Sequence, residues 1–140
     1  MKRKICEGRI SSPFGTRVHP ITKVKSFHNG IDIAYPVGTE IFTPVDSLIA
    51  SVYDHDKGGK TVILKDINTG DRYGFAHLSK PLVKIGQLIP RGSVIALSGN
   101  TGASTGPHLH LTYSIGGTWT GNMSKGHIFQ DPTPKLEFEI

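Results

Sequence analysis

Two histidines that alternate with leucines are the first sign of chemistry in this chain. His108 and His110 alternate with Leu109 and Leu111, directly after a stretch of small residues, which is the pattern of a half-buried strand. Residues two apart in a strand share a face and lie about 6.5–7 Å apart, so both imidazoles can point at one small object. Imidazole is the commonest metal ligand and the usual general base near neutral pH. Alternating histidines also occur on exposed polar faces. A metal site is therefore indicated only if the chain supplies further ligands.

The sequence offers two further ligands upstream. His28 and Asp32 are four residues apart, around an Asn29-Gly30 turn that favours entry into a short strand. Together with His110 they would give two histidines and one carboxylate with an open fourth position. That set is typical of catalytic zinc, because structural zinc sites are closed by four protein ligands, often cysteines, and this chain has one cysteine. From spacing alone, the alternative is a scatter of surface and loop histidines.

The elements that must position these residues are short strands. Turn signals rich in Gly, Pro and Asn separate apolar segments at intervals of about ten residues, and no window of 11 or more residues keeps a helical period. The pattern predicts an all-β sandwich or barrel. Pro13 and Gly15 make Arg9–Thr16 a loop or edge segment. Strands are expected at Glu40–Thr43, Ser47–Tyr53, Lys60–Lys65, Arg72–His77, Val94–Leu97 and His108–Ile115.

Length and composition limit the function classes. A chain of 140 residues suits a single domain, which we expect to span residues 1–140. No apolar run approaches the ~20 residues of a membrane span or forms a secretory signal, so we expect that another route exports the chain or that the sequence is a trimmed piece. The net charge of +5 suits a polyanion such as an anionic wall polymer, or ordinary solubility. Nucleic-acid-binding motifs are absent, so no nucleic-acid partner is expected.

Four segments together carry a family resemblance that covers roughly residues 9–116. In order, they resemble the motifs of lysostaphin/LytM-type zinc endopeptidases, which cleave peptide bonds in bacterial peptidoglycan; the segments are Ser12–Pro20, Phe27–Ala34, Phe75–Ser79 and Gly99–His110. The H-x-x-x-D and H-x-H elements arrive in the family's order and context. The resemblance implies a single all-β domain with a twisted antiparallel sheet and an active-site groove between loops. Residues 117–140 are expected to form a tail packed on that core or extending from it.

The resemblance also implies a role for each site residue. His28, Asp32 and His110 match the zinc ligands, with one Zn²⁺ per chain, and His77 and His108 match two catalytic histidines that are not ligands. The assignment of His77 depends on the match alone, because an isolated histidine is more often a buried structural residue. The implied activity is a zinc-dependent endopeptidase of peptidoglycan stem peptides or cross-bridges, with zinc-activated water as the nucleophile. We expect a monomer that acts in the periplasm, in the cell wall or outside the cell. Because no secretory signal is visible, the resemblance implies either a phage lytic or virion protein or a domain excised from an exported one.

Two departures and two alternatives accompany this prediction. Phe75 stands where the family often has Tyr, and Asp54–Lys65 lacks the usual Gly-x-Gly-Asn of the hairpin there. One alternative is a catalytically inactive relative that binds and regulates cell-wall amidases, and the other is a non-enzymatic, polyanion-binding β module. Both alternatives predict a protein that purifies without stoichiometric zinc.

Overall fold

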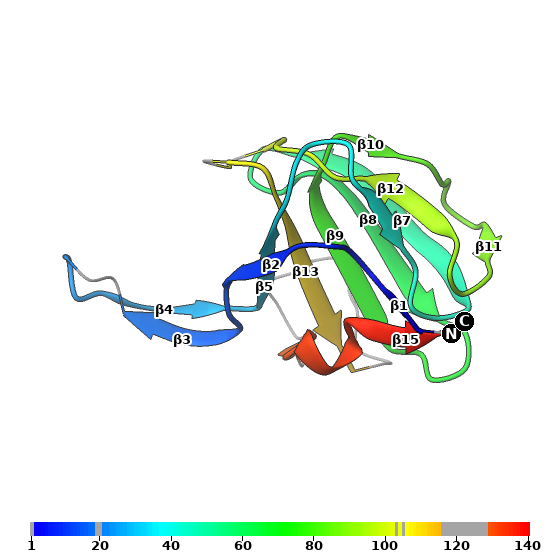
Figure 1. The fold of residues 1–140 in the computed structure, drawn as a ribbon, viewed down its shortest axis with the longest axis horizontal. Coiled ribbons are helices and arrows are strands. Elements are labelled where there is room, and N and C mark those ends of the chain that lie inside the picture. Colours follow the sequence, from blue (N-terminus) through cyan, green and yellow to red (C-terminus); the bar gives the residue numbers. More distant parts are fainter. Residues whose placement is uncertain (1, 19–20, 103, 105, 116–128) are drawn as a thin grey trace.

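The computed structural model describes residues 2–18, 21–102, 104, 106–115 and 129–140, which form antiparallel strands and one short 3₁₀ helix, η1 (Thr133–Lys135) (Figure 1). The strands are β1 (Lys2–Lys4), β2 (Arg9–Ser12), β3 (Gly15–Val18), β4 (Lys25–His28), β5 (Gly30–Ala34), β6 (Glu40–Phe42), β7 (Ser47–His55), β8 (Gly59–Asp66), β9 (Arg72–Leu78), β10 (Lys80–Pro81), β11 (Leu88–Ile89), β12 (Val94–Leu97), β13 (His108–Ser114), β14 (Phe129–Gln130) and β15 (Glu137–Glu139). Within these residues, no helix has the length and apolar character needed to cross a membrane. The all-β prediction is confirmed.

A large sheet forms the body of the molecule. Its strands follow the order β11-β7-β8-β9-β13-β5-β2, with β14 beside β13, and a smaller sheet has the order β10-β12-β6. Phe75, Leu109 and Leu111 of the large sheet are fully buried, and they share one hydrophobic cluster with Ile41 and Ile95 of the small sheet. The two sheets therefore enclose a common core, and β9 and β13 lie in the middle of the larger one.

The predicted strands are found with small changes at their ends. The segment from Ser47 to Asp66 forms the β7–β8 hairpin, whose ladder shifts register between Ile49 and Ser51 and closes with the pair His55 and Gly59. The hairpin therefore forms without the family's Gly-x-Gly-Asn. Arg9–Ser12 pairs with β5 at the edge of the large sheet, as expected of an edge segment. The β3–β4 hairpin was not predicted, because its polar and apolar residues do not alternate cleanly.

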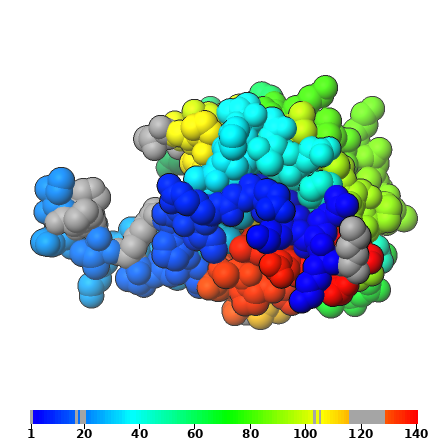
Figure 2. Space-filling view, viewed as in Figure 1, coloured from blue at the N-terminus to red at the C-terminus, as the bar shows by residue number. Residues whose placement is uncertain are grey.

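This β3–β4 hairpin extends away from the body of the molecule (Figures 1 and 2). Its strands pair from Gly15 with His28 to Val18 with Lys25. Phe27 is 61% exposed, whereas His28, the next residue, is buried. The hairpin therefore meets the body at His28, and the following residue begins the turn into β5.

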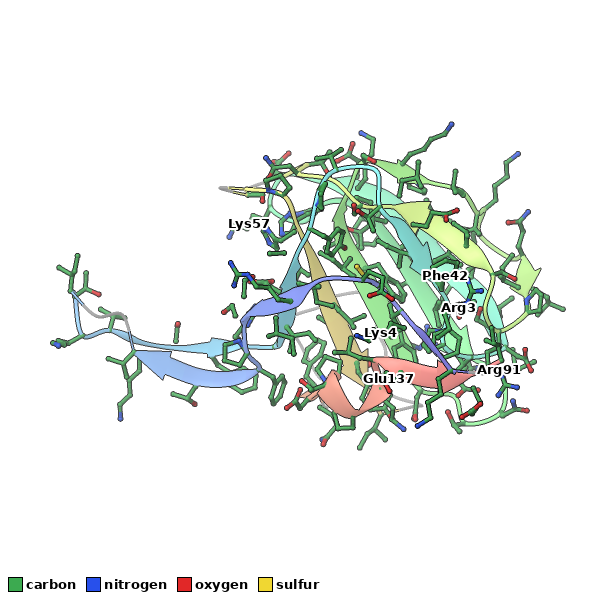
Figure 3. All side chains as sticks on the ribbon, in the orientation of Figure 1. Arg3, Lys4, Phe42, Lys57, Arg91 and Glu137 are labelled. Carbon is green, nitrogen blue, oxygen red and sulfur yellow. The ribbon has the colours of Figure 1, made fainter. Side chains whose placement is uncertain are left out.

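The two ends of the described chain lie together on the opposite side of the molecule from this hairpin (Figure 1). Strand β1 pairs with β15, and the guanidinium of Arg3 lies over the Phe42 ring, 4.4 Å from its centre. Figure 3 shows these two side chains next to each other. Ile5 is fully buried just beyond β1. Of the predicted tail, residues 129–140 contribute β14, η1 and β15 to the body, and residues 117–128 lie outside the described residues.

A close backbone approach fixes the loop that leads towards β13. Gly102 has φ +78°, and a Cβ added there would lie 2.6 Å from the carbonyl oxygen of Lys57 and 2.8 Å from the carbonyl carbon of Gly58. Such distances are well inside van der Waals contact. The loop can therefore lie against the β7–β8 turn only because residue 102 has no side chain.

Gly102→Ala is expected to reduce the free energy of unfolding more than Gly86→Ala. Both glycines have positive φ, +78° and +89°, but an added Cβ meets nothing within 4 Å at Gly86. The difference between the variants therefore isolates the close approach and should be about 1–3 kcal/mol, the usual scale of overpacking. Urea unfolding measures it. Equal destabilisation of the two variants would show that the loop is not packed as described.

Candidate functional site

Three predicted ligands meet where β4, β5 and β13 come together. In the ladder between β5 and β13, Asp32 and His110 are direct partners, so their side chains share one face with Cβ atoms about 4.5–5.5 Å apart. His28 enters from the end of β4. The Oδ1 atom of Asp32 lies 2.9 Å from Nδ1 of His110 and 3.5 Å from Nε2 of His28, and those two nitrogens are 3.3 Å apart. Two ligand atoms from one short segment and a third from a distant strand therefore lie within 4.8 Å of one another, and this group could hold a metal ion.

Hydrogen bonds on the far side of each ring set which nitrogen faces the cluster. Nδ1 of His28 donates to the carbonyl oxygen of Pro13 at 2.9 Å, and Nε2 of His110 lies 2.9 Å from Oδ1 of Asn29. Because a carbonyl oxygen only accepts, the proton of neutral His28 is on Nδ1 and its Nε2 lone pair faces the cluster. For His110 the roles of the two nitrogens are reversed, and Nδ1 faces the cluster. Such outer hydrogen bonds orient histidine ligands in metal sites.

The carboxylate of the cluster is ionised at neutral pH. Burial alone would raise the pKa of Asp32, but His110 and His28 outweigh it. When these imidazoles are protonated on the nitrogens that face the cluster, they donate to the carboxylate and hold its pKa well below its usual range. Two imidazoles and one carboxylate, with no fourth protein ligand among the described residues, are the donor set of a catalytic zinc site. The residues therefore fit the metal that the sequence suggests.

Two more imidazoles flank the cluster. The rings of His77 and His108 have centroids 4.7 Å apart, and Nε2 of His108 lies 3.7 Å from Oδ1 of Asp32. Nδ1 of His108 donates to the carbonyl oxygen of Gly106 at 2.8 Å, and Nδ1 of His77 donates to that of Thr101 at 2.7 Å. In the neutral form each ring consequently carries its lone pair on Nε2, the atom of a proton acceptor.

His77 reaches this face through a break in the strand pattern. Its neighbour Ala76 pairs with His110 and so lies on the site face, and regular alternation would turn His77 towards the core. Instead, His77 has φ +61° at the point where the β8–β9 ladder shifts register, and its ring lies against that of His108. A bulge of this kind re-aims one side chain, and such strained residues cluster at functional sites.

Burial also shapes the acid–base behaviour of His77. Desolvation lowers its pKa below the ordinary 6.5, and the carbonyl of Thr101 offsets this only in part. Burial therefore favours the neutral form of His77, in which Nε2 carries the lone pair.

The structure brings all five predicted site residues to one place, and it adds two that the sequence did not reveal. Asn29 was noted only as part of a turn, yet its amide contacts His110. Thr101 belongs to the loop of small residues, and its hydroxyl donates to the carbonyl of Leu78 at 2.6 Å while accepting from the backbone N–H of Lys60 at 3.0 Å. Thr101 thereby fixes the carbonyl that orients His77. Neither residue has a spacing signal, because each role depends on contacts across strands.

Comparison with known proteins shows which family this chain resembles. The model of peptidase family M23 matches residues 26–122. The peptidoglycan DD-endopeptidase ShyA of Vibrio cholerae is 43% identical over 131 residues, which cover 92% of this chain and 30% of ShyA. The chain thus spans less than a third of the length of that relative.

Two solved structures share the fold. A zinc-containing peptidase from Vibrio cholerae has a TM-score of 0.73 and 36% identity, over 80% of this chain and 35% of that one. The catalytic domain of lysostaphin from Staphylococcus simulans has a TM-score of 0.77 and 28% identity, over 92% of both chains. With a family model matched over most of its length, a lysostaphin-type fold and a cluster of metal-ligand residues, this chain belongs to peptidase family M23.

Proposed function

We propose that this chain is a zinc-dependent endopeptidase that hydrolyses peptide bonds of bacterial peptidoglycan. The observation that carries the proposal is the convergence of His28, Asp32 and His110 beside two further imidazoles with free Nε2 lone pairs. One zinc per chain would be held by Nε2 of His28, Nδ1 of His110 and Oδ1 of Asp32. When bound there, zinc supplies Lewis acidity and lowers the pKa of water towards ~7.

The remaining steps fall to His77 and His108. Their Nε2 atoms are proton acceptors, so one of the pair takes the proton of the attacking water. The imidazolium formed in this way becomes a donor, which can stabilise the developing oxyanion or protonate the leaving amine. Thr101 and Gly106 hold both rings by their Nδ1 atoms, so neither ring needs to reorient during the reaction.

The bond cleaved is proposed to be a cross-link between D-amino acids. ShyA, which is named as a DD-endopeptidase, is 43% identical to this chain. The lysostaphin catalytic domain is less similar, at 28% identity, so the comparison with ShyA has more weight. We accordingly place the action of this chain on the cell wall outside the cytoplasm, as one peptidase domain working as a monomer. Digestion of cross-linked sacculi, followed by mass spectrometry of the muropeptides, tests this directly. Release of monomers from D-amino-acid cross-links supports it, and cleavage confined to glycine bridges contradicts it.

Removal of zinc is expected to abolish the activity reversibly. The described residues provide only three protein ligands, so a strong chelator should extract the metal. Added zinc should restore the activity. Metal analysis should find about one zinc per chain before chelation. Cleavage of sacculi at the full rate after exhaustive chelation would refute the zinc mechanism.

Substitution should separate ligands from catalytic histidines. His110→Ala removes a ligand, so zinc affinity and activity should both fall. His108→Ala leaves all three ligands and should keep the metal while losing about 10²–10⁴ in rate, the scale of a general acid–base partner. Zinc content and muropeptide release, measured on both variants, provide the comparison. Loss of zinc from His108→Ala with retention by His110→Ala would reverse the assignment.

The pH profile should reflect the lowered pKa of His77. If His77 is the member of the pair that accepts the proton, it must be neutral, so activity is lost as the pH falls through its pKa, and burial places that pKa below 6.5. The acid limb of kcat/KM, recorded with zinc in excess, should therefore have its midpoint below pH 6.5. A midpoint at or above that value would contradict the role or the burial of His77.

A further inference from the structure

We propose that Asn29 is a positioning residue of the metal centre. Its amide oxygen holds the proton of His110 on Nε2 and thereby presents the Nδ1 lone pair to the metal. This inference rests on the proposed zinc site and adds to it a residue outside the ligand set.

The geometry around His110 supports this role. Nδ1 lies 2.9 Å from Oδ1 of Asp32 and 3.3 Å from Nε2 of His28, so it is the nitrogen that faces the other ligand atoms. A neutral imidazole has one proton, and coordination through Nδ1 requires that proton to be on Nε2. The side chain of His110 is only 16% exposed, so an Nε2–H without an acceptor would be costly. Oδ1 of Asn29, at 2.9 Å, supplies the acceptor.

The contrast with the other site histidines makes Asn29 distinctive. His28, His77 and His108 each donate from Nδ1 to a backbone carbonyl, which no substitution removes. His110 donates instead from Nε2 to the oxygen of a side chain. The orientation of this ligand is therefore set by the identity of one residue.

The position of Asn29 in the chain links the three ligands. It lies between the end of β4 at His28 and the start of β5 at Gly30, so the turn that directs His28 into the cluster also directs the amide across to β13. One short segment thus supplies His28 and Asp32 and orients His110. Acceptors of this kind raise the basicity of a histidine ligand, and their loss usually costs about 10- to 100-fold in metal affinity.

The experiment measures zinc affinity by competition with a chromophoric chelator. Asn29→Leu removes the acceptor at nearly constant volume and should weaken zinc binding about 10- to 100-fold. Asn29→Asp keeps an oxygen acceptor and adds negative charge near the metal, so it should bind zinc at least as tightly as the wild-type chain. Asn68→Leu, in the exposed turn between β8 and β9, is the matched control and should leave the affinity unchanged.

Thermal melting of the chelated proteins separates orientation from folding. If Asn29→Leu melts far below the control, Asn29→Ala removes the acceptor without the apolar bulk and should weaken zinc binding in the same direction. Equal zinc affinity in the wild-type, Leu and Ala proteins would overturn the role of Asn29, and so would an equal loss in the Asp and Leu variants. If the wild-type chain has no zinc affinity, the proposed function itself is overturned. If the wild-type chain binds zinc and substitution of residue 29 does not change the affinity, only the role of Asn29 is overturned.

Discussion

The pairing of His110 with Asp32 across β13 and β5 is the constraint on which the site depends. A shift of one residue in that register would turn the histidines into the core and the leucines of β13 towards the site. Leu109 and Leu111 are fully buried in the common core, so the hydrophobic packing that stabilises the sheet also keeps the ligand atoms together. The proposed metal centre needs no separate scaffold, because it lies on the polar face of strands whose other face is the core.

Loops and irregular backbone place side chains in the site that regular strand pairing would direct elsewhere. His77 joins the site through a bulge and a positive φ, at a conformational cost of about 1–3 kcal/mol that its surroundings must offset. Its backbone N–H donates to the carbonyl of Gly58 at 2.7 Å, and its ring is held by Thr101. The close contact between Gly102 and the β7–β8 turn keeps Thr101 in place. Rigid positioning of this kind favours catalysis because less reorganisation accompanies the reaction.

Much of this arrangement could be predicted from the sequence, and the exceptions have physical causes. Strand alternation placed His108 and His110 on one face, and the short apolar segments between turns predicted the sheet that holds them. Alternation gave no reason to place His77 on that face, since a bulge is a product of pairing between strands; the family motif was the sole signal. The contact of Asn29 with His110 spans 81 positions in the chain, so no local pattern could reveal it. The β3–β4 hairpin escaped prediction because it has little burial to impose alternation.

The central claim is that Asp32, His28 and His110 hold the catalytic metal through particular atoms. Anomalous diffraction at the zinc absorption edge, from crystals of the chain grown with zinc, tests it most directly. The account predicts one strong peak, about 2.0–2.2 Å from Nε2 of His28, Nδ1 of His110 and a carboxylate oxygen of Asp32, with His77 and His108 outside bonding distance. A peak at any other group, or coordination through Nε2 of His110 or through His108, would contradict it.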